Sequence, residues 1–457
     1  MKLSRAQVER KSRALPQLRF EDQQLTSFSG LVLFQALFAR LALPTSFQQC
    51  FGQLQPSHAY SYALVVLGLV VHILLGYRHL RDSCYYNDDP MVLRLLQLQR
   101  LPHVATVSRV LARITHAMIE QLHHLLRCLV LQRLAALSLR RITLDFDGSV
   151  LGTNRCAEGT AVGFNPKKKG QRSYYPLVCT VAQTGQVFDF LFRSGNVHDS
   201  HGAREFILAC IHAVRTALPG VHIEVRMDSA FFSDEIVAPL HRLGVEFTIS
   251  VPFERFPQLK QIIESRHLWW RVNADLSYFE PKWKPENWSR RFRMLVIRTC
   301  QPIRRKGPIQ LDLFIPYAYN YEFQVVVTNK IIAPRHVAAF HHGRGAQEAV
   351  FAELKSQGQM DYVPTRTMRG NETYLFAAVL AHNLNRELQM EVNPPQRATT
   401  AKRATLWAFE QLATVRQRLV QRAGRLTRPH GVLTLTVSAN PAVRDDLLHH
   451  LDTLQAA

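Results

Sequence analysis

The sequence contains few cysteines and no closely spaced pair of them. Seven cysteines are spread over 457 residues, and no Cys-x-x-Cys motif occurs. An odd number of scattered thiols disfavours a disulfide framework and a zinc site, so we expect buried thiols in a reducing compartment. The cysteines are Cys50, Cys84, Cys128, Cys156, Cys179, Cys210 and Cys300.

Long apolar segments are also missing. The apolar run from Ala63 to Tyr77 is shorter than the ~18 to 20 residues that cross a bilayer, and it carries His72 near its middle. We therefore expect a buried core helix there, with a membrane-associated segment as the alternative. The basic N-terminus has neither the apolar stretch nor the cleavage site of a secretory signal. We expect a cytoplasmic protein.

Acidic residues are scarce relative to basic ones. The chain has 35 Asp and Glu residues and 56 Lys and Arg residues, which gives a formal net charge of +21. This excess predicts a polyanionic partner, with nucleic acid the first candidate and an anionic membrane surface the second. With 47% hydrophobic residues the chain can bury large cores, and its length predicts roughly three structural units.

The first part of the chain, residues 1–138, has leucine-rich helical periodicity interrupted by prolines and is expected to form a helical DNA-binding region. Within it, Thr106 and Ser108 are possible N-caps of a helix that carries Arg109 on its exposed side. This helix could contact DNA as part of a helix-turn-helix, or it could be an ordinary surface helix. No internal repeat or low-complexity segment is present.

From residue 141 the periodicity changes to that of strands. Strands are expected near 141–149, in a hairpin over 175–192, and over 222–228 and 246–252, with helices over about 199–216 and 233–243. Three meandering strands followed by strand and helix alternation match the ribonuclease H-like layout, an α/β fold with a mixed sheet flanked by helices. We expect residues 139–252 and 333–395 to form this catalytic core, 253–332 a β-rich insertion, and 396–457 a basic helical C-terminal region.

Three carboxylates occupy positions from which they can converge. Asp147 ends the first of these strands, Asp228 ends the fourth, and Glu348 lies on a later helix. The first and fourth strands of a ribonuclease H-like sheet are neighbours, so the acids can share one cleft if divalent cations offset their repulsion. Two Mg²⁺ ions, with Mn²⁺ as the alternative, could then drive in-line displacement at phosphorus. Asp145 lies on the same strand face as Asp147 and competes for the first ligand position.

The helix of Glu348 also presents cations on the same stripe. At ~100° per residue, Arg344, Glu348 and Lys355 share one side of a helix, where Arg and Lys could clamp phosphate. An exposed helix with ordinary charge pairs would show the same pattern. Lys167, Lys168 and Lys169 form a second basic cluster, which is either a contact to the phosphate backbone or a solvated turn.

Taken together, these motifs resemble the DDE transposases of bacterial insertion sequences, and most closely insertion-sequence family thirteen-eighty with its Y-R-E-K signature. The resemblance spans roughly residues 140 to 385 and places His341 at the tyrosine of the Y-x2-R-x3-E-x6-K pattern. The matching segments are Leu144-Asp-Phe-Asp-Gly-Ser149, Gly163-Phe-Asn-Pro-Lys-Lys-Lys-Gly170, Ser173-Tyr-Tyr-Pro-Leu177, Arg193-Ser-Gly-Asn196, Arg226-Met-Asp-Ser-Ala-Phe-Phe232 and the stretch from Arg344 to Lys355.

The resemblance implies a nucleoid-associated bacterial enzyme for cut-and-paste DNA transposition. Such an enzyme would bind terminal inverted repeats, hydrolyse phosphodiester bonds with Asp147, Asp228 and Glu348 as metal ligands, and join the ends to target DNA. His341, Arg344 and Lys355 would contact phosphate, and a homodimer would hold the paired ends. Because His341 departs from the pattern, a catalytically impaired or repurposed DNA-binding protein is one alternative, and another ribonuclease H-like nuclease is a second.

Overall fold

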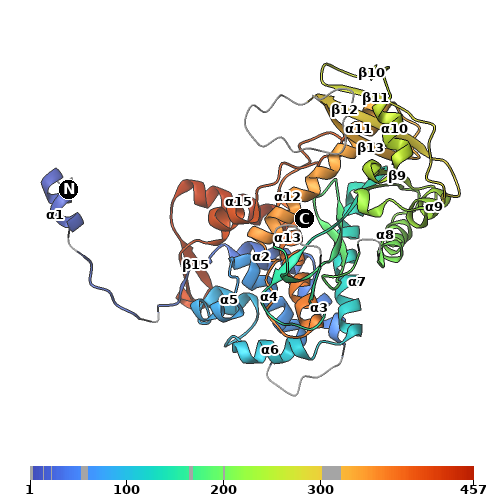
Figure 1. Ribbon diagram of the computed structural model, residues 1–457. Coiled ribbons are helices and arrows are strands. Elements are labelled where there is room, and N and C mark those ends of the chain that lie inside the picture. The colour runs from blue at the N-terminus through green and yellow to red at the C-terminus, as the bar shows by residue number, and fades with distance from the viewer. Residues whose placement is uncertain are drawn as a thin grey trace.

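The computed structural model describes residues 4–13, 15–21, 23–52, 60–163, 168–198, 201–300 and 321–456. A large mixed sheet lies beside a helical body built from both ends of the chain (Figure 1). The helices are α1 (Arg5–Arg13), α2 (Leu31–Arg40), α3 (Leu43–Phe51), α4 (Tyr62–Leu75), α5 (Pro90–Leu95), α6 (Val104–Ala112), α7 (His116–Leu137), α8 (Ala203–Ala217), α9 (Asp234–Arg242), α10 (Pro257–Glu264), α11 (Pro334–His342), α12 (Ala346–Ser356), α13 (Met368–Val392), α14 (Leu412–Val415) and α15 (Pro441–Ala456).

The helical body is organised around α13, which is buried along nearly its whole length. Helices α4, α6, α7 and α15 all pack against it, so segments from the two ends of the chain share one core. The expected helix at Ala63 to Tyr77 is confirmed as α4, whose apolar side chains are buried in that core. In Figure 1 the blue α1 stands apart from this body.

Among the described residues no single helix has the length and apolar composition to cross a membrane. Helices α2 and α3 reach the required length and apolar composition only when taken together, and they are bent by 64° relative to one another.

Among the described residues the main sheet has nine strands, in the order β10-β11-β12-β13-β9-β8-β2-β6-β7. Strands β2, β8 and β9 run parallel, and the remaining pairs are antiparallel. The strands are β2 (Arg141–Gly148), β6 (Leu177–Val181), β7 (Val187–Leu191), β8 (His222–Met227), β9 (Glu246–Ser250), β10 (Trp270–Arg271), β11 (Leu276–Phe279), β12 (Arg293–Cys300) and β13 (Tyr321–Thr328).

The expected ribonuclease H-like layout is confirmed. The hairpin β6–β7, the strands β2, β8 and β9 and the helices α8 and α9 lie where the periodicity predicts them. Residues 199 and 200, the first two of the helix expected over about 199–216, lie outside the described residues. The described strands after β9 extend the main sheet: β13 pairs with β9, and β12, β11 and β10 follow in that order (Figure 1).

Two small sheets were not expected from the sequence. Strands β3 (Leu151–Thr153), β4 (Ala161–Val162) and β5 (Arg172–Tyr174) form one, and β1 (Leu25–Thr26), β14 (Gly424–Thr427) and β15 (Thr434–Val437) form the other. The C-terminal region is therefore not wholly helical, which corrects that part of the expectation. Alternating Leu and Thr before Val437 favour a strand, and β14 also pairs with β1 near the other end of the chain.

The two faces of β2 differ in chemistry. Ile142, Leu144 and Phe146 belong to the hydrophobic core that also contains α8 and α9. Since successive side chains point to opposite faces, Asp145 and Asp147 project toward the other side of the sheet. Helix α11 packs on β9, and the start of α12 contacts β2 and β6 through Gln347. The alternation of β2 thus directs its acids toward these two helices.

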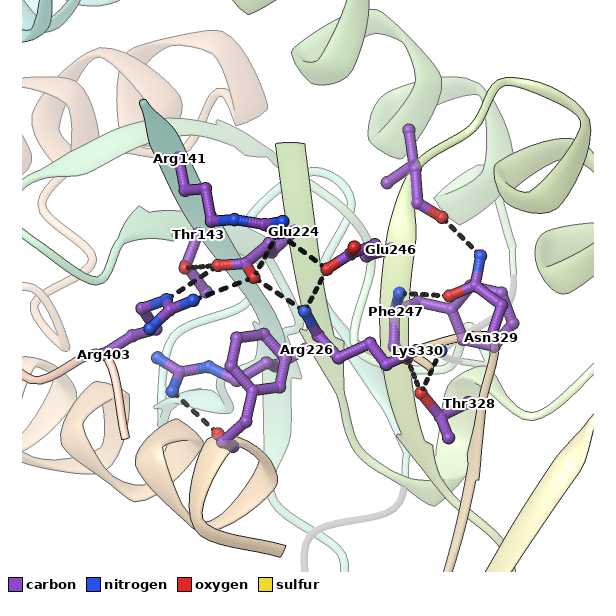
Figure 2. A network of polar contacts seen from close by, with 12 residues as sticks. Arg141, Thr143, Glu224, Arg226, Glu246, Phe247, Thr328, Asn329, Lys330 and Arg403 are labelled. Carbon is purple, nitrogen blue, oxygen red and sulfur yellow. Dashed lines mark hydrogen bonds and ion pairs between the residues drawn. The ribbon is translucent and has the colours of Figure 1, made fainter. Parts of the chain in front are cut away.

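At the amino end of the parallel strands a buried carboxylate holds several segments together (Figure 2). The Glu224 side chain on β8 is 0% exposed and bonds Arg141, Lys330, Arg403 and the Thr143 hydroxyl. Burial alone would raise the pKa of Glu224, but hydrogen bonds from Arg403 and the charge of Lys330 outweigh it and hold the pKa at about 2. The ionised carboxylate therefore stabilises the fold.

A Glu224→Gln protein should be less stable than the wild type at neutral pH, with a difference on the order of 3 kcal/mol. The folded pKa lies below the usual value of 4.5, so this stabilisation is complete above pH ~4.5 and is lost as the pH falls toward about 2. Urea unfolding at several pH values measures it. Glu246→Gln is the control, because Glu246 shares Arg141 and Lys330 but remains 35% exposed. An equal difference at pH 7 and pH 2.5 would contradict the assignment.

Candidate active site

Asp147 and Asp228 occupy corresponding positions at the carboxyl ends of the adjacent parallel strands β2 and β8. The register of β2 and β8 pairs Asp145 with Arg226 and Phe146 with Met227, so the next positions are the two aspartates. Neighbouring strands are about 4.8 Å apart, and residues paired in this way point to the same face. Asp147 and Asp228, one position beyond the last paired residues, therefore lie at neighbouring strand ends, and the predicted metal site that they share with Glu348 stays a prediction.

Local backbone contacts orient both carboxylates at the carboxyl edge of the sheet. One oxygen of Asp147 accepts a hydrogen bond from the Gly148 N–H at 2.8 Å. One oxygen of Asp228 accepts from the Ala230 N–H at 3.0 Å and caps the short helical turn Ser229–Phe231. Both side chains are partly exposed, whereas the strand residues that precede them are buried. Asp147 and Asp228 thus lie where the buried strands end at the protein surface.

Glu348 lies on a helix that is fixed against these strands. Helix α11, the 3-10 turn Gly343–Gly345 and helix α12 follow one another without a break, and Glu348 is in the first turn of α12. The preceding residue, Gln347, is buried and donates to the backbone oxygens of Asp145 at 3.1 Å and Val178 at 3.2 Å. These bonds hold the start of α12 against β2 and β6, while the Glu348 side chain remains exposed.

Arg344 connects this helix to the first carboxylate. Its Nη1 atom lies 3.2 Å from Oδ2 of Asp147, and both side chains are partly exposed. Residues four apart on a helix lie on the same side, with about 5–6 Å between their Cβ atoms. Because Arg344 faces Asp147, Glu348 also lies on the side of the helix that borders the two aspartates.

The donor set fits a hard divalent cation in its chemistry. Two carboxylates on adjacent strand ends and a third on the neighbouring helix supply the oxygen ligands that Mg²⁺ prefers. Within the described part of the chain, no group of three or more His, Cys, Asp or Glu side chains is drawn together at ligand distance. Arg344 partly neutralises Asp147 in this arrangement, so a cation at Asp147 would compete with its guanidinium.

Asp145, the other possible first ligand, is engaged elsewhere. Both of its oxygens accept from the guanidinium of Arg226, at 2.6 and 2.7 Å, and its side chain is 2% exposed. Burial raises the pKa of Asp145, and the charge of Arg226 counteracts this rise. The contacts therefore favour Asp147, the preferred residue, as the acid available at the strand end.

His341 is a buried residue close to the candidate site. The side chain is buried, and its ring nitrogens bond the hydroxyls of Ser250 at 2.8 Å and Thr248 at 3.1 Å on β9. Burial and the neighbouring charge of Arg344 lower the pKa of His341 to about 3, so the ring is neutral at physiological pH. In the structure this histidine attaches α11 to the sheet, and its expected contact to phosphate stays a prediction.

The remaining basic candidates are spread over several elements. Lys355 lies two helical turns beyond Glu348 and is partly exposed, and Lys168 and Lys169 are exposed before β5. Lys167 lies outside the described residues. Arg109 is exposed on α6 and bonds within its own helix to Ala105 and Thr106. The phosphate contacts expected of these residues stay predictions.

Sequence reasoning missed two polar residues that organise the site, Gln347 and Arg226. Gln347 gives no signal in the sequence, because it stands between Ala346 and Glu348 on a helix whose pattern only predicts a buried face. Arg226 does give a signal. A charged residue inside an apolar strand must be paired, and its position two residues before Asp228 could have directed attention to Asp145.

The fold and the site define a ribonuclease H-like protein with acids at the ends of adjacent parallel strands. Residues 9–457 match the family model described as Transposase DDE domain group 1, and the chain belongs to this family. No curated protein matches the chain.

Solved transposase structures show distant similarity. A piggyBac transposase synaptic complex with hairpin DNA is 10% identical, with 86% of this chain and 80% of that chain covered and a TM-score of 0.39. A Mos1 transposase paired-end complex with left transposon end is 12% identical, covering 43% of this chain and 60% of that chain, with a TM-score of 0.18.

An Arg344→Ala protein should bind Mn²⁺ more tightly than the wild type, because the substitution removes the cation that competes for Asp147. A partly exposed ion pair contributes up to about 1 kcal/mol, so the affinity should rise by at most about fivefold. Titration followed by electron paramagnetic resonance of free Mn²⁺ measures it. Arg335→Ala, an exposed position on α11, is the control. Weaker Mn²⁺ binding by Arg344→Ala would show that Arg344 does not compete with the ion.

Proposed function

We propose that this protein is a cut-and-paste DNA transposase of the insertion-sequence family thirteen-eighty type, with Arg344, Glu348 and Lys355 in the Y-R-E-K pattern. It would bind the terminal inverted repeats of its element, hydrolyse phosphodiester bonds there and join the ends to target DNA. The main support is that Asp147 and Asp228 occupy corresponding positions at the ends of two parallel strands, next to Arg344 and the helix of Glu348. The chain also belongs to the DDE transposase family.

The proposed chemistry assigns a role to each of these side chains. Asp147, Asp228 and Glu348 would hold two Mg²⁺ ions, with Mn²⁺ as a substitute. When bound, the ions would activate a water or a 3′-hydroxyl and stabilise the leaving oxygen. Arg344 would leave Asp147 and bind a non-bridging phosphate oxygen, since a guanidinium pairs with phosphate as readily as with carboxylate. Lys355 would add a cation further along the same helix.

The proposal also includes the assembly and its place in the cell. Joining two ends in one reaction requires both ends to be held together, so we propose a homodimer on paired ends. The net charge of +21 suits a DNA-bound, nucleoid-associated protein in the bacterial cytoplasm.

Replacement of the three acids tests the proposed chemistry. Asp147→Asn, Asp228→Asn and Glu348→Gln should each lower the rate of Mg²⁺-dependent cleavage of terminal-repeat DNA by at least about 100-fold. The reason is that each change removes one charged metal ligand from the reacting site. DNA affinity, measured in the same buffer by fluorescence anisotropy, should stay within about threefold because phosphate contacts come from cations.

Glu372→Gln is the control for these acids, because Glu372 contacts His123 in the helical body. It should cleave like the wild type. A Glu348→Gln protein that cleaves at the wild-type rate would show that Glu348 is not part of the active site. A wild-type protein that binds terminal repeats without cutting them would instead identify a repurposed DNA-binding protein.

A basic cleft beside α6 offers a path for the DNA. It has a volume of about 800 Å³ and is lined by Ser108 and Ala112 of α6, by Arg155 and by residues 364–367. Arg155 and Arg366 are both exposed, and Arg155 is steadied by a hydrogen bond to the Pro364 oxygen at 3.1 Å. Arg109 lies on the same helix, so the expected DNA-contacting helix would form one wall of this cleft.

Arg155→Ala and Arg366→Ala should weaken binding to duplexes of any sequence and lower the salt dependence of binding. Each lost phosphate contact reduces the slope of log K against log salt concentration by about 0.9. Anisotropy titrations at four salt concentrations measure the slope. Glu158→Gln is the matched control of opposite sign. Glu158 is an exposed acid that bonds the Met368 N–H beside the cleft, and its neutralisation should leave binding unchanged or stronger. Unaltered slopes in both arginine variants would exclude the cleft.

A further inference from the structure

Arg226 is a fully buried cation in the middle of the sheet. Its side chain is 0% exposed, and its Nε and Nη2 atoms donate to the two oxygens of Asp145 at 2.6 and 2.7 Å. Its Nη1 atom donates to the backbone oxygens of Phe340 at 2.9 Å and Lys402 at 2.7 Å. Every nitrogen of the guanidinium therefore has a partner within the protein. Figure 2 shows Arg226 in the sheet just below Glu224 and beside Arg403.

The groups that Arg226 joins belong to the elements that carry the three candidate ligands. Asp145 precedes Asp147 by two residues on β2, and Arg226 precedes Asp228 by two residues on β8. Phe340 lies in the last turn of α11, which leads into Arg344 and Glu348. The backbone ladder sets the spacing of the two strands, and the guanidinium of Arg226 ties the end of α11 to both of them.

A glycine allows the helix to come this close. A Cβ atom at Gly343 would lie 2.0 Å from Nη1 of Arg226 and 2.0 Å from the Lys402 oxygen. Its φ of −59° is helical, so any residue could adopt this backbone conformation. Gly345, two residues later, has a similar φ of −55°, and nothing lies within 4 Å of its Cβ position. Glycine is therefore needed at position 343 for space rather than for backbone freedom.

A buried ion pair is not the most stabilising way to fill this part of the core. Two buried charges lose their hydration, and well-packed apolar residues of similar volume stabilise such positions equally well or better. The gain from the pair is geometric, because a planar guanidinium fixes both the direction and the spacing of the groups that it bonds. The ring of Phe340, whose centroid is 5.2 Å from Cζ of Arg226, covers one side of it.

We propose that Arg226, paired with Asp145 and packed against Gly343, is the positioning residue that holds the helix of Glu348 against the strands that end at Asp147 and Asp228, the acids that would bind divalent cations. Arg226 touches neither metal nor DNA and acts through the backbone segments that it joins. The inference rests on the proposed function for the identity of the metal ligands, and it adds the residue that holds these ligands in register.

The test compares two substitutions with matched controls, all in the full chain. Arg226→Lys keeps the charge but loses the planar fork, and Gly343→Ala keeps both charged residues but removes the space for the guanidinium. Arg133→Lys is the control for the first, because Arg133 is an arginine with a 12% exposed side chain that pairs with Glu387 and Glu391 in the helical body. Gly345→Ala is the control for the second.

Mn²⁺ binding, followed by electron paramagnetic resonance without DNA, is the first readout. Arg226→Lys and Gly343→Ala should weaken it by at least about tenfold, the usual effect of losing a group that orients metal ligands. Single-turnover cleavage of terminal-repeat DNA at saturating Mn²⁺ should be slowed by about 100-fold, with little change in DNA affinity. Both controls should stay within about twofold on both readouts, and melting temperatures establish that each variant is folded.

Wild-type Mn²⁺ affinity in a folded Arg226→Lys protein would overturn the inference. An Arg226→Lys chain that does not fold would overturn it too, because the residue would then hold the fold rather than the ligands. If Gly343→Ala alone fails to fold, Arg226→Lys decides. A wild-type protein that binds Mn²⁺ but cuts no DNA would contradict the proposed function and leave the positioning role intact, since the first readout needs no DNA.

Discussion

The parallel register of β2 against β8 is the constraint on which the rest of the candidate site depends. Side chains alternate between the faces of a strand, so a slip of one residue would turn Asp147 or Asp228 into the apolar core beneath α8 and α9. The apolar residues Ile142, Leu144 and Phe146 resist that slip because they would then meet the polar side. Hydrophobic burial on one face thus determines the position of charge on the other.

The same sheet buries charge at both ends of its parallel strands. At the amino end Glu224 is surrounded by cations and stays ionised. Nearer the carboxyl end Asp145 is matched by Arg226, and Asp147 is approached by Arg344. The acids become less enclosed toward the strand ends, from 0% exposure at Glu224 to 19% at Asp147. The buried carboxylates that stabilise the fold are paired with cationic side chains, whereas the carboxylates near the strand ends are accessible to ions in the solvent.

Local periodicity was enough to predict the two strands that end at Asp147 and Asp228. The two-residue alternation from Arg141 to Asp147 and from His222 to Asp228 defined strands, and the order of strands and helices defined neighbours. The contacts of Arg226 could not be derived in this way, because Phe340 and Lys402 lie 114 and 176 residues away in the sequence. The burial of His341 was missed for a similar reason, since its partners on β9 lie more than 90 residues away.

The backbone oxygen of Lys402 has a consequence for how the protein can be divided. It lies in the segment after α13, and its neighbour Arg403 bonds Glu224. Residues that would be assigned to a C-terminal appendage therefore complete the interior of the main sheet. The pairing of β1 with β14 joins the two ends of the chain in the same way. A fragment cut between α13 and this segment would lack part of its own core, so truncation and fusion points belong outside it.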